Sequence, residues 1–398
     1  MVNFDRNEAS RYMTEPGPKP VISGKKAVAA SQSAPATEAM LRILDDGGNA
    51  VDAAIAGSLV NGVVDHFHTN HAGTSTFLYW HAKTGILYGL DATGTFPHEL
   101  PLFYPMPDVG HNFTSHFQVA ACIPGFMPGL DLMHSRFGSK PWGDLVDDAI
   151  YWAEEGYFLN SVSHANHVSQ WPFRLYFPDG REMHLPNDGH LPSVGQRFLN
   201  PALAQTMKRL KEEGPDCFTT GSWAIEFVKT ANEMGWPITI AHMTANPPSW
   251  AEPFRFNHRD FEIVQLPLPQ AQGVLCALAM GILDKLGICE MAPLSAQWLY
   301  AMGHVLRWVL KEICYLNDPQ YFDVPTDVWT DSQYHAHIAK IIGGMKPKVD
   351  VTAHLEKVAG KIQLHASGQA LGHPTDPVHK VPSGSCELLV VDNEGNWV

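Results

Sequence analysis

The stretch Gly47-Gly48-Asn49-Ala50-Val51-Asp52-Ala53-Ala54 joins two predicted helices and sets the start of the fold. Upstream, residues 35–44 carry apolar side chains at helical spacing, and the glycine pair ends that helix. Asn49 is a favourable N-cap for a second helix over residues 50–64, which is rich in Ala and Gly. Small side chains along a whole helix allow other elements to approach closely, so we expect the second helix to be buried.

Strand and helix patterns continue on both sides of this pair. A short buried strand is predicted over residues 27–31, and two more strands follow at 77–80 and 85–90. The region 160–200 is rich in aromatic residues and His but has few periodic signals. Additional helices are predicted from apolar periodicity at 142–155, 203–213, 223–235, 271–286 and 296–316.

The end of the chain has the pattern of a β-hairpin. Strand-like residues 387–391 and 396–398 flank the turn Asp392-Asn393-Glu394-Gly395. Because the second strand is so short, the hairpin is expected to leave a sheet edge open. We therefore expect a second polypeptide to continue the sheet.

The composition excludes several classes of protein. The chain has 398 residues, of which 27 are basic and 41 acidic, so its formal net charge is −14. This acidic balance argues against nucleic acid or an anionic membrane as the main partner. A hydrophobic fraction of 45% excludes a disordered chain. A charged fraction of 17%, against about 25% in a typical soluble domain, indicates a large core or a buried subunit interface.

The cysteines and the apolar segments indicate in which cellular compartment the protein is expected. Six cysteines occur without a CxxC pair, as is typical of scattered reduced thiols. The polar N-terminus lacks the apolar stretch of a signal peptide. The longest charge-free apolar run, residues 264–283, includes Pro267 and Pro269 and does not fit a membrane span. We expect a soluble, cytoplasmic protein.

Several sequence blocks point to one family when taken together. Residues 47–54 read GGNAVDAA, Cys122 begins CIPG, and Leu266 begins LPLPQAQG. In their order these blocks resemble the gamma-glutamyltransferase (transpeptidase) family, which is part of the N-terminal-nucleophile hydrolase superfamily. The full set lies at residues 47–54, 122–130, 137–156, 266–273, 316–325 and 385–398.

This resemblance implies an architecture and a type of activity. The expected fold is α+β, a four-layer αββα arrangement that a second chain completes. Residues 1–26 are expected to form an N-terminal arm, 27–384 the large-subunit region, and 385–398 the start of the small subunit. The resemblance implies an amide hydrolase or acyltransferase that cuts itself from a precursor and works through a covalent acyl-enzyme. It implies no cofactor, a small-molecule amide substrate, and a heterotetramer or larger oligomer with the small subunit.

The family nucleophile, a Thr at the start of the small subunit, is matched here by Ser385. Autocleavage needs a hydroxyl or thiol that attacks the preceding carbonyl, and Gly384 is the least obstructive residue at that position. Cleavage frees an α-amine with a pKa of about 7.7–8.0, which suits a general base. Three alternatives remain open: Ser383-Gly384-Ser385 as a simple turn, Cys386 as the nucleophile, and a cut elsewhere, including directly after Val398.

Substrate contacts are expected at Thr93, Gly94 and Thr95. The family uses an Arg in this stretch to grip the α-carboxylate of a γ-glutamyl group, and Thr93 takes its place here. A hydroxyl cannot replace a forked cation, so we expect an amide other than a standard γ-glutamyl compound. An Arg from another loop, such as Arg174 or Arg181, is the alternative.

Two further readings belong to other functional classes. His66, His68 and His71 have the spacing of a metallo-hydrolase ligand run, with His335 and His337 as additional candidates. The absence of a convincing fourth ligand leads us to expect that metal is dispensable for activity. The third reading is a catalytically dead scaffold subunit of the same family.

Overall fold

The structure of the protein is a computed structural model that describes residues 22–97, 99–100, 122–175, 177–185, 189–266, 268–319, 321–344 and 385–398. The chain divides into two compact units, one of Met1–Trp250 with Pro377–Val398 and the other of Ala251–Asp376. Most of the arm predicted over residues 1–26 lies outside the described residues, and the boundary at 384/385 stays a prediction.

The two helices predicted around the glycine pair are α2 (Ala34–Asp45) and α3 (Ala50–Val64). Asn49 caps α3 by accepting from the first backbone N–H groups, and the Asp52 carboxylate accepts from the N–H of Asn49 in return. Every residue of α3 is buried. This confirms the expectation drawn from its small side chains.

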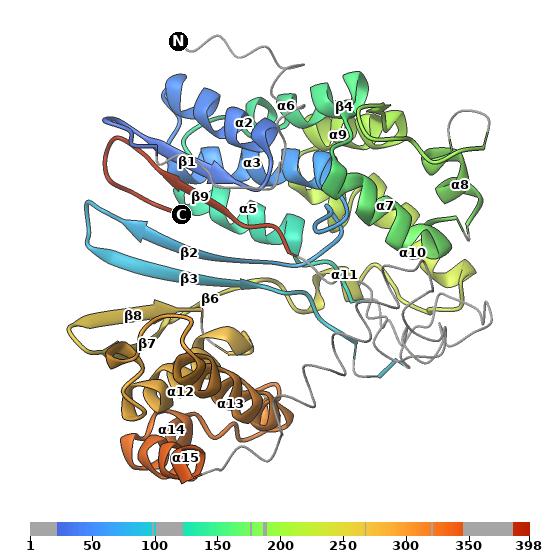
Figure 1. Ribbon diagram of the computed structural model, residues 1–398. Coiled ribbons are helices and arrows are strands. Elements are labelled where there is room, and N and C mark those ends of the chain that lie inside the picture. Colours follow the sequence, from blue (N-terminus) through green and yellow to red (C-terminus); the bar gives the residue numbers. More distant parts are fainter. Residues whose placement is uncertain are drawn as a thin grey trace. The chain divides into compact units, whose positions relative to one another are not determined.

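Strands from both ends of the chain pack beside these helices (Figure 1). β1 (Val28–Ser31) pairs antiparallel with β9 (Leu388–Val391). β2 (Ser75–His81) pairs antiparallel with β3 (Ile86–Ala92), which also pairs with β6 (Ser249–Ala251). Strands from near the start of the chain and from its last residues therefore share one unit.

The last residues of the chain join β9 to β2. Val398 and Val390 exchange backbone hydrogen bonds of 3.0 and 3.1 Å, and Trp397 and Trp80 exchange a second pair of 3.1 and 2.8 Å. The short second strand of the hairpin is thus paired on both sides. This pairing involves only Trp397 and Val398, and the expected continuation of the sheet by a second polypeptide stays a prediction.

Two helices occupy the region 160–200, where the sequence gave few signals. They are α7 (Ser161–Arg174) and α8 (Pro178–His184). Among the described side chains of α7, residues 161–168, the buried ones are Ser163, Asn166 and His167, which have helical spacing and are polar. Buried polar residues add nothing to a hydrophobic periodicity, so this part of the helix could not be predicted from the apolar pattern.

The remaining elements of the first unit complete its core around α3, with Trp152, Phe198 and Phe218 among the largest fully buried side chains. The predicted helices at 142–155, 203–213 and 223–235 are confirmed within a few residues. These elements are α5 (Phe126–Phe137), α6 (Trp142–Glu155), β4 (Tyr157–Phe158), β5 (Arg197–Phe198), α9 (Pro201–Glu213), the 3₁₀ helix η2 (Pro215–Phe218), α10 (Ser222–Glu233) and α11 (His242–Ala245).

The second unit has a core of its own, which gathers Leu278, Val305, Trp329 and Ile338. Its helices α12 and α13 match the two predicted in this part of the chain. Its elements are β7 (Phe254–His258), β8 (Phe261–Gln265), α12 (Ala271–Lys285), η3 (Ile288–Glu290), α13 (Ala296–Glu312), η4 (Ile313–Tyr315), α14 (Thr326–Thr330) and α15 (Ser332–Gly344).

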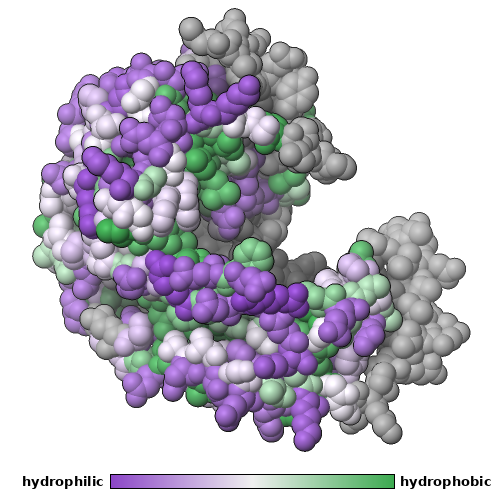
Figure 2. Space-filling view, turned by 90° about the vertical axis from the view of Figure 1, so that its left-hand side faces the viewer, coloured by the Kyte–Doolittle hydropathy of each residue, from purple (hydrophilic) through white to green (hydrophobic). Residues whose placement is uncertain are grey.

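Hydrophilic side chains cover much of the face shown in Figure 2. None of the described helices combines the length and the apolar character needed to cross a bilayer.

Candidate active site

Ser385, the predicted nucleophile, lies three positions before β9 and is exposed. Its carbonyl accepts a hydrogen bond of 3.0 Å from Nε2 of Gln32, in the connection between β1 and α2. Because Gln32 follows directly on β1, which pairs with β9, this contact holds the backbone of Ser385 at the edge of the β1–β9 pair.

The next residue, Cys386, enters a chain of hydrogen bonds. Its thiol donates to Oδ2 of Asp65 at 2.7 Å, and Oδ1 of Asp65 lies 2.8 Å from Nδ1 of His68. Nε2 of His68 lies 3.3 Å from Nδ2 of Asn166 on α7. The amide nitrogen Nδ2 of Asn166 can only donate, so His68 accepts at Nε2 and donates from Nδ1 to Asp65. The Ser385–Cys386 segment is thereby tied to the turn after α3 and to α7.

This hydrogen-bond network affects the reactivity of Cys386, the alternative nucleophile. Burial and the neighbouring Asp65 carboxylate raise the pKa of the Cys386 thiol far above its usual range. The thiolate is the reactive form of cysteine, so this thiol stays protonated and unreactive. Gln32, Asp65 and Asn166 could not be predicted from the sequence, because their contacts with this segment span long distances in the chain.

The predicted metal run of His66, His68 and His71 does not converge. His71 is buried and donates from Nε2 to the carbonyl of Leu59 at 2.9 Å. Burial lowers the pKa of His71 to about 4, so it is neutral. His68 belongs to the Asp65 network, and His66 contacts the hydroxyl of Tyr157 at 3.0 Å. The three imidazoles are close in sequence, but each one contacts a different set of residues.

The additional candidate His335 belongs to the second unit. Its Nε2 donates to the carbonyl of Trp329 at 2.8 Å, and the side chain is buried. It therefore has the role of a packed core residue.

The predicted substrate stretch, Thr93 to Thr95, forms a tightly held turn. The Thr93 hydroxyl donates to Oδ1 of Asp91 at 2.6 Å. Gly94 has φ +77°, and a Cβ there would lie 2.3 Å from the carbonyl oxygen of Ile123. Thr95 and Ile123 exchange backbone hydrogen bonds. The turn is thus fixed against residues 122–125, another of the resembling blocks, whereas Ser385 is fixed against Gln32.

Of the two alternative arginines, Arg181 is the one whose side chain the structure describes. Nη1 of Arg181 donates to the carbonyl of Leu175 at 2.8 Å, within its own segment. The side chain of Arg174 lies outside the described residues.

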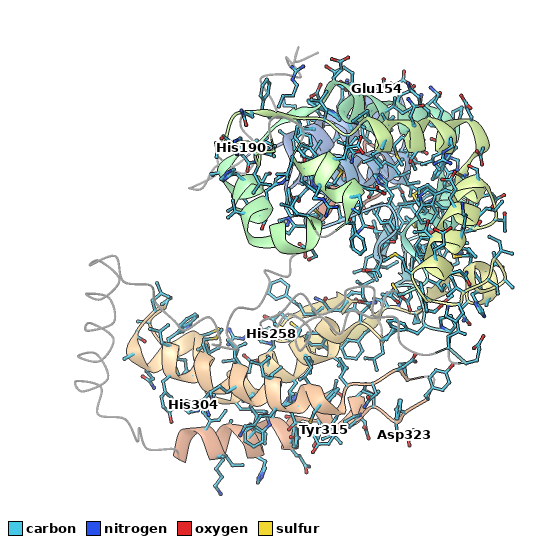
Figure 3. The ribbon with its side chains drawn as sticks, turned by 90° about the vertical axis from the view of Figure 1, so that its right-hand side faces the viewer. Glu154, His190, His258, His304, Tyr315 and Asp323 are labelled. Atoms are coloured by element: carbon cyan, nitrogen blue, oxygen red, sulfur yellow. The ribbon has the colours of Figure 1, made fainter. Side chains whose placement is uncertain are left out.

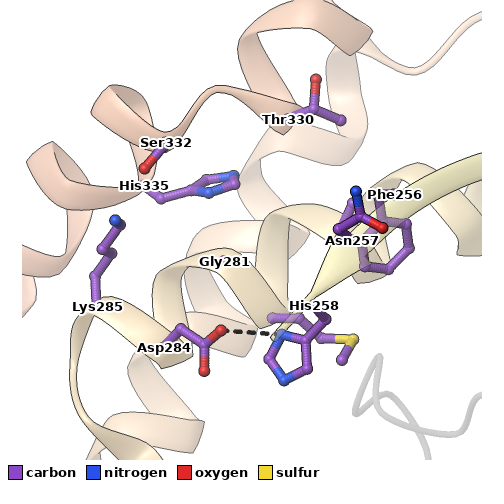
Figure 4. Close-up of a pocket in the computed structure, with 11 residues that line it drawn as sticks. Phe256, Asn257, His258, Gly281, Asp284, Lys285, Thr330, Ser332 and His335 are labelled. Atoms are coloured by element: carbon purple, nitrogen blue, oxygen red, sulfur yellow. Dashed lines mark ion pairs between the residues drawn. The ribbon is translucent and has the colours of Figure 1, made fainter. Parts of the chain in front are cut away.

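A separate pocket of about 260 Å³ lies within the second unit (Figure 4). Its wall includes the ion pair of His258 Nδ1 with Asp284 at 3.0 Å, and Lys285 and Ser332 lie nearby. It contains neither Ser385 nor the turn at 93–95, so we do not assign it to the same site.

Known proteins resemble this chain over most of its length. The gamma-glutamyltranspeptidase family model matches residues 36–398. The chain is 29% identical over 303 residues to the glutathione hydrolase proenzyme of Pseudomonas aeruginosa, covering 74% of this chain and 52% of that protein. It is 26% identical over 326 residues to glutathione hydrolase proenzyme 1 of Schizosaccharomyces pombe, covering 79% and 50%. The chain thus spans about half the length of these relatives.

Solved structures support the same fold. The gamma-glutamyltranspeptidase of Pseudomonas nitroreducens, complexed with L-DON, has a TM-score of 0.71 at 25% identity, covering 82% of this chain and 96% of that chain. The cephalosporin acylase of Bacillus halodurans has a TM-score of 0.72 at 20% identity, covering 96% and 66%. The expected α+β fold of N-terminal-nucleophile hydrolases is confirmed. From the family match and the shared fold, the chain belongs to the gamma-glutamyltranspeptidase family.

Proposed function

We propose that this protein is an amide hydrolase or acyltransferase whose nucleophile is Ser385, exposed as an N-terminus by cleavage after Gly384. The observation that carries the proposal is the anchoring of the segment at Ser385. The Ser385 carbonyl is held by Gln32, the adjacent Cys386 is held by Asp65, and β9 follows directly. A nucleophile held at the end of a paired strand keeps its position when the bond before it is cut.

The cleavage step uses the Ser385 hydroxyl and one water. Oγ attacks the carbonyl carbon of Gly384, and the bond from that carbon to the Ser385 nitrogen breaks, which gives an ester and a free α-amine. Water then hydrolyses the ester and releases the Gly384 carboxylate. The new amine is close enough to its own hydroxyl to act as the general base.

The catalytic cycle repeats this acyl chemistry on a substrate. Oγ attacks the amide carbonyl, the amine of Ser385 takes the proton and passes it to the leaving amine, and an acyl-enzyme ester remains. Attack by water on this ester completes hydrolysis, and attack by another amine completes transfer. No metal or cofactor enters the scheme.

We propose a substrate amide other than a standard γ-glutamyl compound. Thr93 is engaged with Asp91 and offers no cation to a substrate carboxylate. Relatives in the comparison include the capsule biosynthesis protein CapD proenzyme of Bacillus anthracis, at 25% identity, and a cephalosporin acylase of the same fold. The fold is thus found in a protein named for another substrate, the cephalosporin acylase.

We further propose that the active protein contains a small subunit from the same precursor, assembled as a heterotetramer or larger oligomer, in the cytoplasm. The small subunit is supported by the relatives, which are named proenzymes.

Intact mass measurement of every chain in the purified, complete gene product tests the proposal. Cleavage after Gly384 gives a chain that begins with Ser385, and Ser385→Ala abolishes both cleavage and turnover. Cys386→Ser is the matched control, and it keeps cleavage.

An acylating inhibitor should modify the Ser385 amino-terminal peptide. A label on another N-terminal residue would assign the nucleophile elsewhere, and an uncut, unlabelled protein would favour the scaffold reading.

A further inference from the structure

Three histidines from separate segments meet in the core of the first unit. His66 lies in the turn after α3, His167 lies on α7, and His184 is the last residue of α8. His167 is 0% exposed and His184 1%. The three side chains bring ring nitrogens within 4.8 Å of one another. α7 and α8, which carry two of them, also contact each other.

The ring separations match the geometry of a metal centre. The ring centroids are 5.6 Å apart for His66 and His167, 5.9 Å for His66 and His184, and 5.1 Å for His167 and His184. Zinc lies about 2.0–2.1 Å from a His nitrogen, which puts each ring centroid about 3.2 Å from the ion and the centroids about 5.2 Å apart at tetrahedral angles. The His167–His184 separation is within about 0.1 Å of this value, and the two separations that involve His66 are somewhat longer.

The surroundings of the three rings suit an ion that is held by imidazoles. The Tyr157 hydroxyl lies 3.0 Å from Nδ1 of His66, where it can accept the Nδ1 proton and leave Nε2 as the ligand atom. Phe198 stacks on His66 at 5.2 Å and on His184 at 5.7 Å between centroids. The aromatic ring fixes both imidazole planes and limits the access of water.

We propose that His66, His167 and His184 form a three-imidazole site for one divalent transition-metal ion, with zinc as the best fit and a water in the fourth position. Imidazole donors select the later first-row metals over Mg²⁺ and Ca²⁺. Such an ion ties α7 and α8 to the turn that follows α3. The same turn carries Asp65 and His68, which hold Cys386. The ion therefore stabilises the frame of the candidate active site and takes no part in the acyl chemistry.

The binding test uses the purified, complete protein and metal alone as the probe. After chelation and dialysis, we expect one equivalent of Zn²⁺ to bind per chain and to raise the Tm. One equivalent of Co²⁺ should give the intense visible absorption of a tetrahedral site. A wild-type protein that gives neither stoichiometric binding nor this absorption overturns the proposal.

Matched variants locate the ion. His167→Gln and His184→Gln should each lose stoichiometric binding and the zinc-dependent rise in Tm. His164→Gln, on the same helix, and His190→Gln, at an exposed position (Figure 3), should keep both. Tyr157→Phe keeps the ring and removes the hydroxyl, so it should weaken zinc affinity by about 10–100-fold without abolishing binding. Full binding by the folded His167→Gln and His184→Gln proteins contradicts the assignment.

Discussion

The carboxylate of Asp392 accepts a hydrogen bond of 3.0 Å from the backbone N–H of Ala50, 342 positions away in the chain. The same carboxylate accepts from the backbone N–H groups of Glu394 and Asn396 and from Nδ2 of Asn396. Asp392 thus closes the terminal hairpin turn and also satisfies an amide at the start of α3, where a negative charge is favoured. Two sequence blocks from opposite ends of the chain meet in this contact.

Asp392→Ala should lower the free energy of unfolding by about 2–4 kcal/mol, because it removes a helix-terminal acceptor and leaves buried donors unsatisfied. Urea denaturation measures the change. Asn393→Ala, at the neighbouring exposed position, is the control and should be near neutral. Equal losses in the two variants would show that the buried carboxylate has no special role.

His71 should make the protein sensitive to acid. Its pKa is lowered to about 4 in the folded state by burial, against 6.5 in the unfolded chain. The unfolded state therefore binds a proton first, and stability falls as the pH drops from about 6.5 to about 4. For one group this amounts to roughly 3 kcal/mol. Denaturation curves across this range should show a shallower pH dependence for His71→Gln, whose amide can still donate to Leu59. An unchanged slope would contradict the assignment.

Gly281 and Gly303 make a matched pair within the second unit. A Cβ on Gly281 of α12 would lie 2.1 Å from Nδ1 of the buried His335, whereas a Cβ on Gly303 of α13 meets nothing within 4 Å. Gly281→Ala should destabilise the unit by about 1–3 kcal/mol through overpacking. Gly303→Ala should stabilise it by about 0.4–1 kcal/mol, because Ala is the better helix former. Thermal unfolding of the two variants checks both signs.

Cys386 should resist alkylation in the folded protein. Its pKa is raised by burial and by the Asp65 carboxylate, while Cys289 and Cys314 are exposed. Peptide mapping after a short iodoacetamide pulse at pH 8 should find Cys289 and Cys314 modified first. Asp65→Asn removes the charge and should speed modification of Cys386 relative to Cys289 in the same molecule. Rapid labelling of Cys386 in the wild type would contradict its place in the network.

Substrate preference tests the interpretation of Thr93. Initial rates on glutathione or a γ-glutamyl anilide, compared with a panel of uncharged amides, should favour the uncharged set. The reason is that a missing charge-assisted pair costs about 1.5–3 kcal/mol, or roughly 10–150-fold in kcat/KM. Strong preference for the γ-glutamyl donors would mean that another cation reaches the substrate.

The sequence by itself determined those helices and strands that depend on interactions between residues close together in the chain. The glycine pair, the Asn49 cap and the small residues of the second helix predicted α2 and α3 correctly, because capping and periodicity act over a few residues. The ordered blocks also determined the family. The same local reasoning predicted the terminal hairpin, but it could not predict that Trp397 pairs with Trp80 of β2.

Only the tertiary structure decided what each distant residue contacts. It separated His66, His68 and His71, although their spacing predicted a shared site, because burial of each ring depends on the helices that pack against it. It brought His167 of α7 and His184 of α8 to His66, and the buried residues among the described side chains of α7 are polar and so carry no hydrophobic signal. It also joined Cys386 to Asp65 and Asp392 to Ala50. Hydrogen bonds across hundreds of residues depend on the packing of whole elements, and no local pattern in the sequence encodes them.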